Sequence, residues 1–327
     1  MTITVQSPGL HSTLQDVGRP GYYAMGVPPS GALDMYAHEA ANALCGNVSH
    51  AASIEVTFLG PTLVFSVPTV IAVTGADIDV TLDGMPVPGW MSQFVRAGQT
   101  LTFGTLRGGA RAYLAVRGGF ATPLVMGSRS TYALSRLGGL NGGPLRAGDV
   151  LHIGDDVLPG SDRRPGEIVP ESLRPRSSGE QDIRVVPGLC DYRLTADAKE
   201  VLYSTPYEVA TEANRTGYRF HGASLGFVPR VAPFGAGDDP SNVVNLGYPI
   251  GSIQAPSGSE LICLLRDAVT GGGYATVGTV ISADLDLIAQ LKAPDRVMFW
   301  AVSVDEALAA RRDRRLRLER IATLVQR

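Results

Sequence analysis

Short runs of β-forming residues, separated by tight turns, recur along the chain, and this pattern most strongly constrains the fold. The sequence contains 39 Gly and 22 Pro, the residues that end regular elements and form turns, and few stretches with helical periodicity. No alternation of strand and helix is visible, so barrels or sandwiches are favoured over a doubly wound sheet. The strands predicted in the first half are Thr2–Gln6, Ile54–Phe58, Thr62–Val67, Val70–Thr74, Ile78–Leu82, Thr100–Gly104, Arg111–Val116 and Val150–Ile153.

Two local signals in this half are specific. Asp83-Gly84 separates two predicted strands, and a two-residue hairpin turn needs positive φ at both of its central positions, which Asp-Gly supplies. One helix is predicted, with Asp34 as its N-cap and Gly46 as its C-cap.

A polar, proline-rich stretch at residues 161–181 is typical of a linker. It predicts an N-terminal domain at 1–160 and a C-terminal domain at 182–327. Beyond it, the predicted strands are Ile183–Val186, Tyr218–His221, Leu261–Leu265, Val277–Ile281 and Val297–Val302, and the predicted helices are Ala196–Tyr203 and Ala283–Leu291. The arginine-rich C-terminal segment is interpreted as a solvated surface helix, with docking of a partner as the alternative.

Bulk composition narrows the class of protein. The formal net charge is −3, so the overall charge gives no reason to expect nucleic acid binding. No signal peptide is evident at the N-terminus, and no apolar run is long enough for a membrane span. The three cysteines, Cys45, Cys190 and Cys263, are far apart, which argues against a disulfide framework and favours the cytoplasm.

Three catalytic motifs fail on inspection. His38-Glu39 is not followed by the second histidine of a zinc helix, because that position is Asn42, and no metal site is predicted. Ser224 lies in a Gly-x-Ser-x-Gly pattern, but Pro229 and Pro233 follow it, so the helix of a nucleophile elbow cannot start there. The sequence also contains no P-loop pattern.

Four stretches together resemble one family. They are Thr13–Gly21 with Ser30–Asp34 and Gly46-Asn47; Tyr113–Gly119 with Gly127-Ser128 and Leu145–Asp149; Val186–Gly188 with Asn214–Arg219 and Gly222; and Gly251–Pro256 with Asp267–Tyr274 and Val280-Ile281. In this order they resemble the allophanate hydrolase subunit 2 family. That family includes the C subunit of prokaryotic 5-oxoprolinase, an antagonist of a sporulation-kinase inhibitor, and part of the carboxyltransferase region of urea carboxylase.

The resemblance implies a mainly β protein with a few helices, built as two cyclophilin-like β-barrel domains. It implies a B-subunit partner with a related barrel and, in 5-oxoprolinase, an A subunit. The implied reaction is ATP-dependent opening of the 5-oxoproline lactam to glutamate. ATP is then the expected cofactor of the complex, and biotin is expected only for a carboxyltransferase.

This chain departs from the family pattern at three places. Val269 replaces a glutamine and Gly271 a threonine in the Asp267–Tyr274 stretch, and Gly143 stands where an arginine is usual. The segment between Gly222 and Gly251 is unlike the family. Loops at a barrel mouth commonly shape a substrate pocket, so another small amide, lactam or carboxylated substrate is an alternative.

Opening a lactam needs cationic groups for the substrate carboxylate and phosphates, donors for the developing oxyanion, and a base for water. The candidates with these chemistries are Asn214, Arg215, Arg219 and Gln254 for substrate binding, and Asp267 and Tyr274 for catalysis. Of these, Asn214, Arg215, Gln254 and Asp267 are expected to line one cleft of the second domain. Candidates for an interface or a structural role are Gln15, Asp16, Arg19, Ser30 and Ser128.

A structural interpretation stays open beside each functional one. Arg215 could pin a loop within a turn, and Asp267 could cap a turn. Asp16 and Arg19 could form an internal ion pair, and Ser30 could be a turn residue, as could Ser128. Three functions therefore remain: a subunit of an ATP-dependent lactam or amide hydrolase, a regulatory protein that antagonises a kinase inhibitor, and a carboxyltransferase component of a urea carboxylase or allophanate hydrolase system.

Overall fold

The computed structural model describes residues 1–159, 165–175 and 179–324. Its contacts divide the chain into two units. Unit 1 comprises Met1–Arg19, Ser30–Ser177 and Arg315–Arg327, and unit 2 comprises Pro20–Pro29 and Ser178–Arg314. Both units therefore draw on separate stretches of sequence, and a ten-residue excursion near the N-terminus belongs to unit 2.

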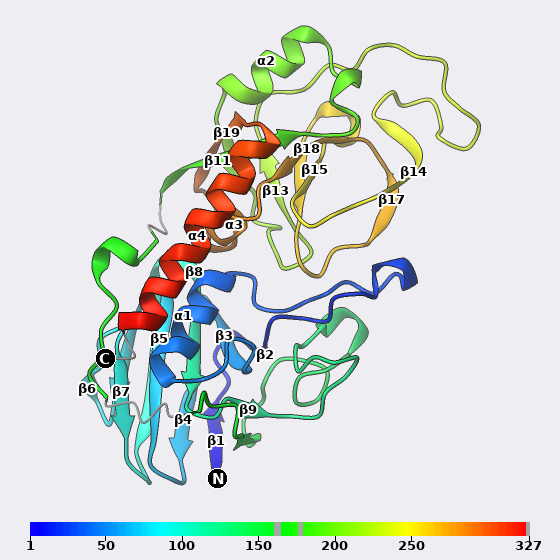
Figure 1. Cartoon of the computed structure of the whole chain (residues 1–327). Helices are drawn as coiled ribbons and strands as arrows, with labels where there is room; N and C mark the ends of the chain where they lie inside the picture. Colours follow the sequence, from blue (N-terminus) through cyan, green and yellow to red (C-terminus); the bar gives the residue numbers. More distant parts are fainter. Residues whose placement is uncertain (160–164, 176–178, 325–327) are drawn as a thin grey trace. The chain divides into compact units, whose positions relative to one another are not determined.

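Unit 1 is built on one antiparallel sheet that curves around one core cluster, and a second cluster surrounds helix α1 (Figure 1). The order of its main path is β2-β3-β8-β4-β1-β10-β9, and β5 joins it by pairing with β8. Apolar residues from opposite ends of this path, such as Leu14 of β2 and Phe120 of β9, share one core cluster, as expected for a barrel. The strands described in this unit are β1 Thr2–Ser7, β2 His11–Gln15, β3 Ser53–Thr57, β4 Thr62–Phe65, β5 Thr69–Leu82, β6 Met85–Pro86, β7 Ser92–Val95, β8 Thr100–Val116, β9 Phe120–Ala121 and β10 Val150–Ile153.

The two specific local predictions for this unit are confirmed. Helix α1 spans Met35–Cys45; the Asp34 side chain accepts a hydrogen bond from the Ala37 amide, and Gly46 ends the helix at φ 72°. Asp83 and Gly84 both have positive φ, 49° and 82°, and they join β5 to β6. The two pairs of runs predicted as separate strands at 70–82 and 100–116 are instead continuous, as the long strands β5 and β8.

Unit 2 is a closed barrel with a two-stranded ribbon beside it. The barrel order is β11-β18-β15-β16-β13-β12-β19, and the pairing of β19 with β11 closes it. The barrel strands are β11 Glu180–Pro187, β12 Tyr207–Val209, β13 Gly217–His221, β15 Ser252–Gln254, β16 Leu261–Leu264, β18 Thr276–Val280 and β19 Arg296–Ala301; the ribbon is β14 Asn242–Gly247 with β17 Gly271–Tyr274. The helices of this unit include α2 Ala196–Ser204 and α3 Leu285–Gln290, and both were predicted.

The region predicted as a linker, 161–181, is partly outside the described residues, at 161–164 and 176–178. In the part that is described, Glu171–Leu173 forms a short 3-10 helix and β11 already begins at Glu180. Leu173 is buried and packs in the same cluster as α1.

The C-terminal segment forms the predicted helix, and most of its residues are exposed, but it is also anchored by a few buried ones. Helix α4, Val304–Leu324, does form (red in Figure 1). Ile321 is fully buried in the cluster around α1, and the Arg317 guanidinium lies 5.2 Å from the centre of the Tyr36 ring. On the unit 2 part of the helix, Arg314 bonds to Asp286 at 2.5 Å. A few apolar residues at helical spacing are enough to hold α4 against the protein, because the aliphatic parts of its arginine side chains also pack on apolar surface.

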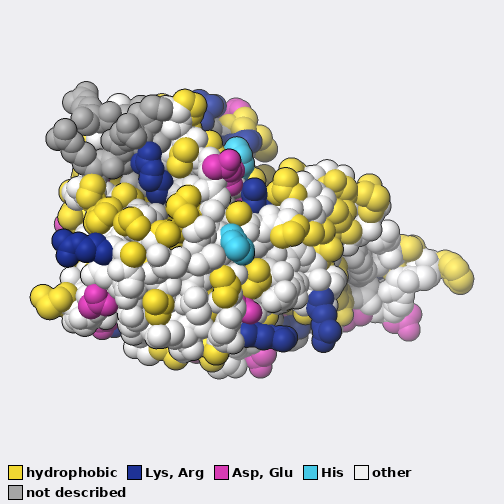
Figure 2. Space-filling view, turned by 90° about the horizontal axis from the view of Figure 1, so that it is seen from below, with side chains coloured by type: hydrophobic (Ala, Val, Ile, Leu, Met, Phe, Trp, Pro, Cys, Tyr) yellow, Lys and Arg dark blue, Asp and Glu magenta, His cyan; other side chains and the backbone are white. Residues whose placement is uncertain are grey.

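Charges of both signs are spread over the surface. The sequence has 28 Lys and Arg residues against 31 Asp and Glu. On the face that Figure 2 shows, the basic side chains lie in small separate groups, with hydrophobic, acidic and uncharged side chains between them. A continuous basic stripe of the kind that follows a nucleic acid backbone is not visible on this face.

Candidate functional site

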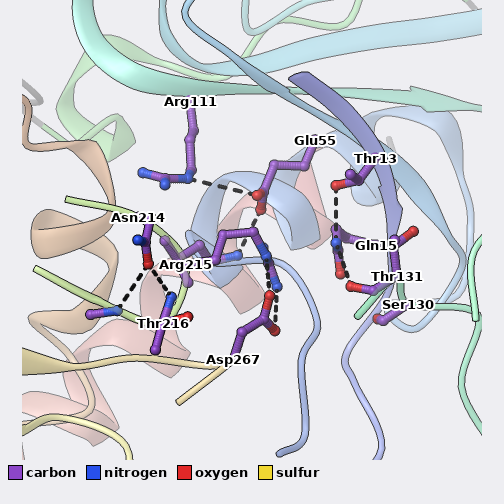
Figure 3. A network of polar contacts seen from close by, with 12 residues as sticks. Thr13, Gln15, Glu55, Arg111, Ser130, Thr131, Asn214, Arg215, Thr216 and Asp267 are labelled. Carbon is purple, nitrogen blue, oxygen red and sulfur yellow. Dashed lines mark hydrogen bonds and ion pairs between the residues drawn. The ribbon is translucent and has the colours of Figure 1, made fainter. Parts of the chain in front are cut away.

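The corner formed by the turns before β13 and after β16 holds three of the predicted site residues (Figure 3). Arg215 binds Asp267 with two parallel bonds, Nε to Oδ2 at 2.8 Å and Nη2 to Oδ1 at 3.1 Å. Their side chains are only 11% and 6% exposed. The Asp267 amide also donates to the Arg215 carbonyl at 3.1 Å. A buried bidentate pair of this kind fixes the orientation of both groups.

Asn214 shapes the turn that delivers Arg215. Its Oδ1 accepts the amide of Thr216 at 2.8 Å and, more weakly, that of Gly217 at 3.4 Å. This is the Asx-turn geometry by which asparagine replaces a backbone acceptor. The amide oxygen is thus used locally, while the side-chain nitrogen makes a longer contact of 3.5 Å to the Glu212 carbonyl.

Gln254 lies farther along β16 from this corner. Gly217 pairs with Leu264 at one end of the β13–β16 ladder, and Arg215 and Asp267 lie beyond that end. Gln254 pairs with Ile262, toward the other end of β16. The structure therefore brings Asn214, Arg215 and Asp267 together and separates Gln254 from them.

Tyr248 connects Gln254 and Tyr274 in a second cluster. Its hydroxyl donates to the Tyr274 carbonyl at 2.9 Å and accepts the Tyr274 amide at 2.7 Å. Burial raises the pKa of Tyr248, and hydrogen bonds to the Tyr274 backbone and the Gln254 side chain oppose this shift. Tyr248 thus ties the glycine-rich strand β17 to the barrel, while the Tyr274 side chain is half exposed.

A shallow pocket of about 650 Å³ opens beside this cluster. The excursion at Pro20–Pro29 contributes Tyr23 and Ala24 to it, and the barrel side contributes Gly247, Tyr248, Pro249, Ile250 and Thr270. Burial raises the pKa of Tyr23, while the positive charge of Arg266 opposes the shift. A pocket of this size suits a small organic molecule. Sequence reasoning missed Tyr23 and Tyr248; the available signal was the position of Tyr23 two residues after the Arg19-Pro20-Gly21 motif.

Arg219 is the remaining substrate-binding candidate. It lies on β13 and forms an ion pair with Glu260 at 2.5 Å, with side chains 42% and 24% exposed. An ion pair this exposed contributes little to stability, and its position on the strand does not place it with Arg215.

In unit 1, the motif around Asp16 closes on the loop at residues 125–131. The Asp16 carboxylate accepts hydrogen bonds from the Gly18 amide, from the hydroxyls of Ser128 and Ser130, and from the Arg129 amide at 2.6 Å. Four donors on one buried carboxylate make it a central structural group of this loop.

Other candidates of unit 1 surround this network. Arg19 donates to the carbonyl oxygens of Ser130 and Val125. The Gln15 side-chain nitrogen donates to the Thr13 hydroxyl at 3.0 Å and the Thr131 carbonyl at 3.1 Å. Ser30 is fully buried with φ 53°. The geometry supports structural roles for these residues within unit 1.

A buried cluster that sequence reasoning did not find anchors the start of α1. The Glu55 carboxylate accepts the Leu33 amide at 2.8 Å and the Tyr113 hydroxyl at 2.7 Å, and that hydroxyl accepts the Asp34 amide at 2.8 Å. Arg111 lies 3.7 Å from Glu55 on its other side. Burial, and then the negative charges of Glu55 and Asp34, raise the pKa of Tyr113 well above 10.

Several other classes of site lack support in the described ranges, 1–159, 165–175 and 179–324. They contain no group of three or more His, Cys, Asp or Glu residues that could hold a metal ion, and no helix in them is long and apolar enough to cross a membrane. The three cysteines are free and buried. Ser224 lies in a loop without the helix that a nucleophile elbow requires.

This geometry defines a class of protein with two β-barrels, in which the second barrel carries a buried ion pair at one corner and a small pocket. The chain belongs to the family described as carboxyltransferase domain, subdomain A and B, whose model matches residues 25–301. It is 35% identical to the urea amidolyase of Saccharomyces cerevisiae, over 93% of this chain and 17% of that protein. It is 33% identical to the C subunit of 5-oxoprolinase from Escherichia coli, over 96% of both.

A solved structure of a relative has the same fold. A crystal structure of the Kluyveromyces lactis urea carboxylase matches 98% of this chain with a TM-score of 0.92 and 32% identity, but only 29% of that chain is covered. The chain thus spans less than a third of the urea amidolyase and urea carboxylase that it matches. Its mainly β fold with two barrels is the fold of the corresponding part of urea carboxylase.

Proposed function

We propose that this chain is a subunit of an ATP-dependent hydrolase that opens a small lactam or amide, most simply 5-oxoproline to glutamate, together with a B-subunit homologue and an A subunit. The observation that carries the proposal is the match to the C subunit of 5-oxoprolinase over 96% of both chains. Nearly every region of that relative has a counterpart here, whereas most of urea amidolyase does not.

The chemistry of the second barrel is compatible with this reaction. ATP can transfer a phosphoryl group to the lactam oxygen and leave as ADP. Water then attacks the activated carbon, and the ring C–N bond breaks with the nitrogen taking a proton, which gives an acyl phosphate. A second water releases phosphate and leaves the new carboxylate. Such a reaction needs a cation for the substrate carboxylate and a donor for the oxyanion. In the proposal, the Arg215–Asp267 corner, which Asn214 shapes, supplies the oriented cation and carboxylate. Gln254 and Tyr248 position Tyr274 as the donor.

The test is reconstitution from purified subunits. The chain, its B-subunit homologue and the A subunit are combined, and ATP hydrolysis is measured with 5-oxoproline, other lactams and ureas. The proposal expects lactam-dependent phosphate release by the complex and none by the chain alone. Turnover of 5-oxoproline by the single chain would contradict the division of labour, and no lactam-dependent turnover by the full complex would contradict the function.

A second candidate is a carboxyltransferase component of a urea carboxylase type of system. The TM-score of 0.92 with the Kluyveromyces lactis enzyme favours it. This function requires a biotinylated partner and bicarbonate. The same reconstitution separates the two candidates, because avidin and removal of bicarbonate abolish a biotin-dependent reaction and leave a lactam hydrolase unchanged. Tight binding to a kinase inhibitor without turnover would instead support the regulatory alternative.

A further inference from the structure

Gly247 ends strand β14 and is a glycine that the fold itself does not require. It pairs with Gly271 in regular register, so no bulge explains it. Its φ lies outside the left-handed region that favours glycine, and a Cβ atom at this position would meet no described heavy atom within 4 Å apart from its chain neighbours. Gly272 on the partner strand differs, because a Cβ there would lie 3.0 Å from the Tyr248 ring. Glycine weakens a strand, and close approach of a ligand is one of the few reasons to place it there.

Gly247 lines the pocket of about 650 Å³ described above. Tyr23, Tyr248 and Ile250 line it too, and its surface is mainly apolar. The Tyr248 hydroxyl is already bonded to the Tyr274 backbone at 2.9 and 2.7 Å. A small, polar lactam such as 5-oxoproline would lose its bonds to water here and find few replacements. A flat heterocycle suits the pocket better, because an aromatic ring offers it a stacking face.

A positive charge lies near one wall of this pocket. Arg266 is close enough to Tyr23 for its charge to oppose the rise in the pKa of that hydroxyl. Arg266 directly precedes Asp267, whose amide donates to the Arg215 carbonyl at 3.1 Å. The pocket and the ion-paired corner therefore share one turn of the chain. This combination fits a ligand that carries a planar ring and an anionic group, because a guanidinium binds phosphate or carboxylate oxygens.

Resting on the function proposed above, we propose that this pocket binds the adenine ring of ATP against Tyr23, with the phosphates toward Arg266. The proposed reaction consumes ATP, and the sequence contains no P-loop to hold it. Stacking on an aromatic side chain binds a base without such a loop. Gly247 is glycine in this arrangement because a side chain would occupy the space of the base. The Arg215–Asp267 corner, adjacent to Arg266 in the chain, remains for the lactam.

The experiment compares Gly247→Val with Asn245→Val, a matched control because Asn245 is exposed on the same strand and does not line the pocket. Binding of ATP, adenosine and inorganic triphosphate to the full chain is measured by calorimetry. Gly247→Val is expected to weaken binding of ATP and adenosine about tenfold or more, since the added methyl groups overlap the base, whereas Asn245→Val binds like wild type. Neither variant should lower the melting temperature, because both positions are exposed and valine favours a strand.

Two further variants separate the base from the phosphates. Tyr23→Ala removes the stacking face and is expected to weaken binding of ATP and adenosine alike, by about 5- to 150-fold. Arg266→Met is expected to weaken binding of ATP about tenfold or more and to leave adenosine unchanged, because adenosine carries no negative charge.

Other outcomes refute the proposal in distinguishable ways. Equal ATP affinity of Gly247→Val and wild type refutes the pocket as the base site, as does binding of triphosphate that is as tight as that of ATP. No binding of ATP by the wild-type chain also refutes the site and leaves the proposed function standing, because another subunit can then hold the nucleotide. Nucleotide binding that Gly247→Val abolishes, in a complex without lactam-dependent phosphate release, supports the site and refutes the proposed function.

Discussion

Asp267→Asn should destabilise unit 2 strongly, because it removes the charged partner that Asp267 provides to the buried guanidinium of Arg215. The two side chains are 11% and 6% exposed and share bonds of 2.8 and 3.1 Å. Breaking a buried pair by removing one partner costs about 3–5 kcal/mol, since the remaining charge stays desolvated. Arg215→Lys keeps a charge but loses the fork, for which we expect about 1.5–3 kcal/mol.

The two tryptophans allow the stability of each unit to be measured separately, because Trp90 lies in unit 1 and Trp300 lies on β19 in unit 2. In a Trp90→Phe background, the fluorescence of Trp300 during urea unfolding gives the free energy of unfolding of unit 2. The double variant Arg215→Met, Asp267→Leu should lose less stability than Asp267→Asn, because it leaves neither charge of this pair buried without the other. A loss below about 1 kcal/mol for Asp267→Asn would refute the reasoning. If Arg215→Lys lowers ligand affinity without lowering stability, Arg215 binds substrate rather than pinning its turn.

Three further outcomes are expected. Asp16→Asn should destabilise unit 1 by about 3–5 kcal/mol in urea unfolding followed by Trp fluorescence, because an amide cannot accept from all four donors. Burial raises the pKa of Tyr203 to about 12 and that of Tyr113 well above 10; the stability that comes from keeping these hydroxyls neutral is present below about pH 10 and falls as the pH rises through 12, which urea midpoints between about pH 8 and 11.5 will check. Ile321→Ala should cost about 2–5 kcal/mol through the cavity it leaves, whereas Arg320→Ala on the exposed side of α4 should change the melting temperature little.

Local signals in the sequence predicted local structure well. The Asp34 and Gly46 caps define α1 because each satisfies backbone groups that only a helix end leaves free. Asp83-Gly84 defines a hairpin for a similar reason. The barrel class followed from the density of strands and from the family resemblance, and the match to the Kluyveromyces lactis structure confirms it.

The sequence did not predict which residues pack against each other over long range. Nothing in the composition of α4 announces that Ile321 is buried, because most of its residues are polar and docking depends on what the rest of unit 1 leaves uncovered. The residue types at the Arg215 corner were predicted, but the side-chain partners were not. Whether Arg215 faces Asp267 or Gln254 depends on the register of β13, β15 and β16, which a single sequence does not encode locally.

The excursion at Pro20–Pro29 affects the order in which the two units can be completed during synthesis on the ribosome. These ten residues are made early, yet they belong to unit 2. Roughly 270 residues separate Pro29 from Ala301, where β19 ends and the second barrel can close. At about 5–20 residues per second on the ribosome, the excursion waits roughly 15–50 s for its partners. Tyr23 and its neighbours then stay exposed while unit 1 already has most of its strands. A fragment beginning at residue 178 would lack this wall of the pocket altogether.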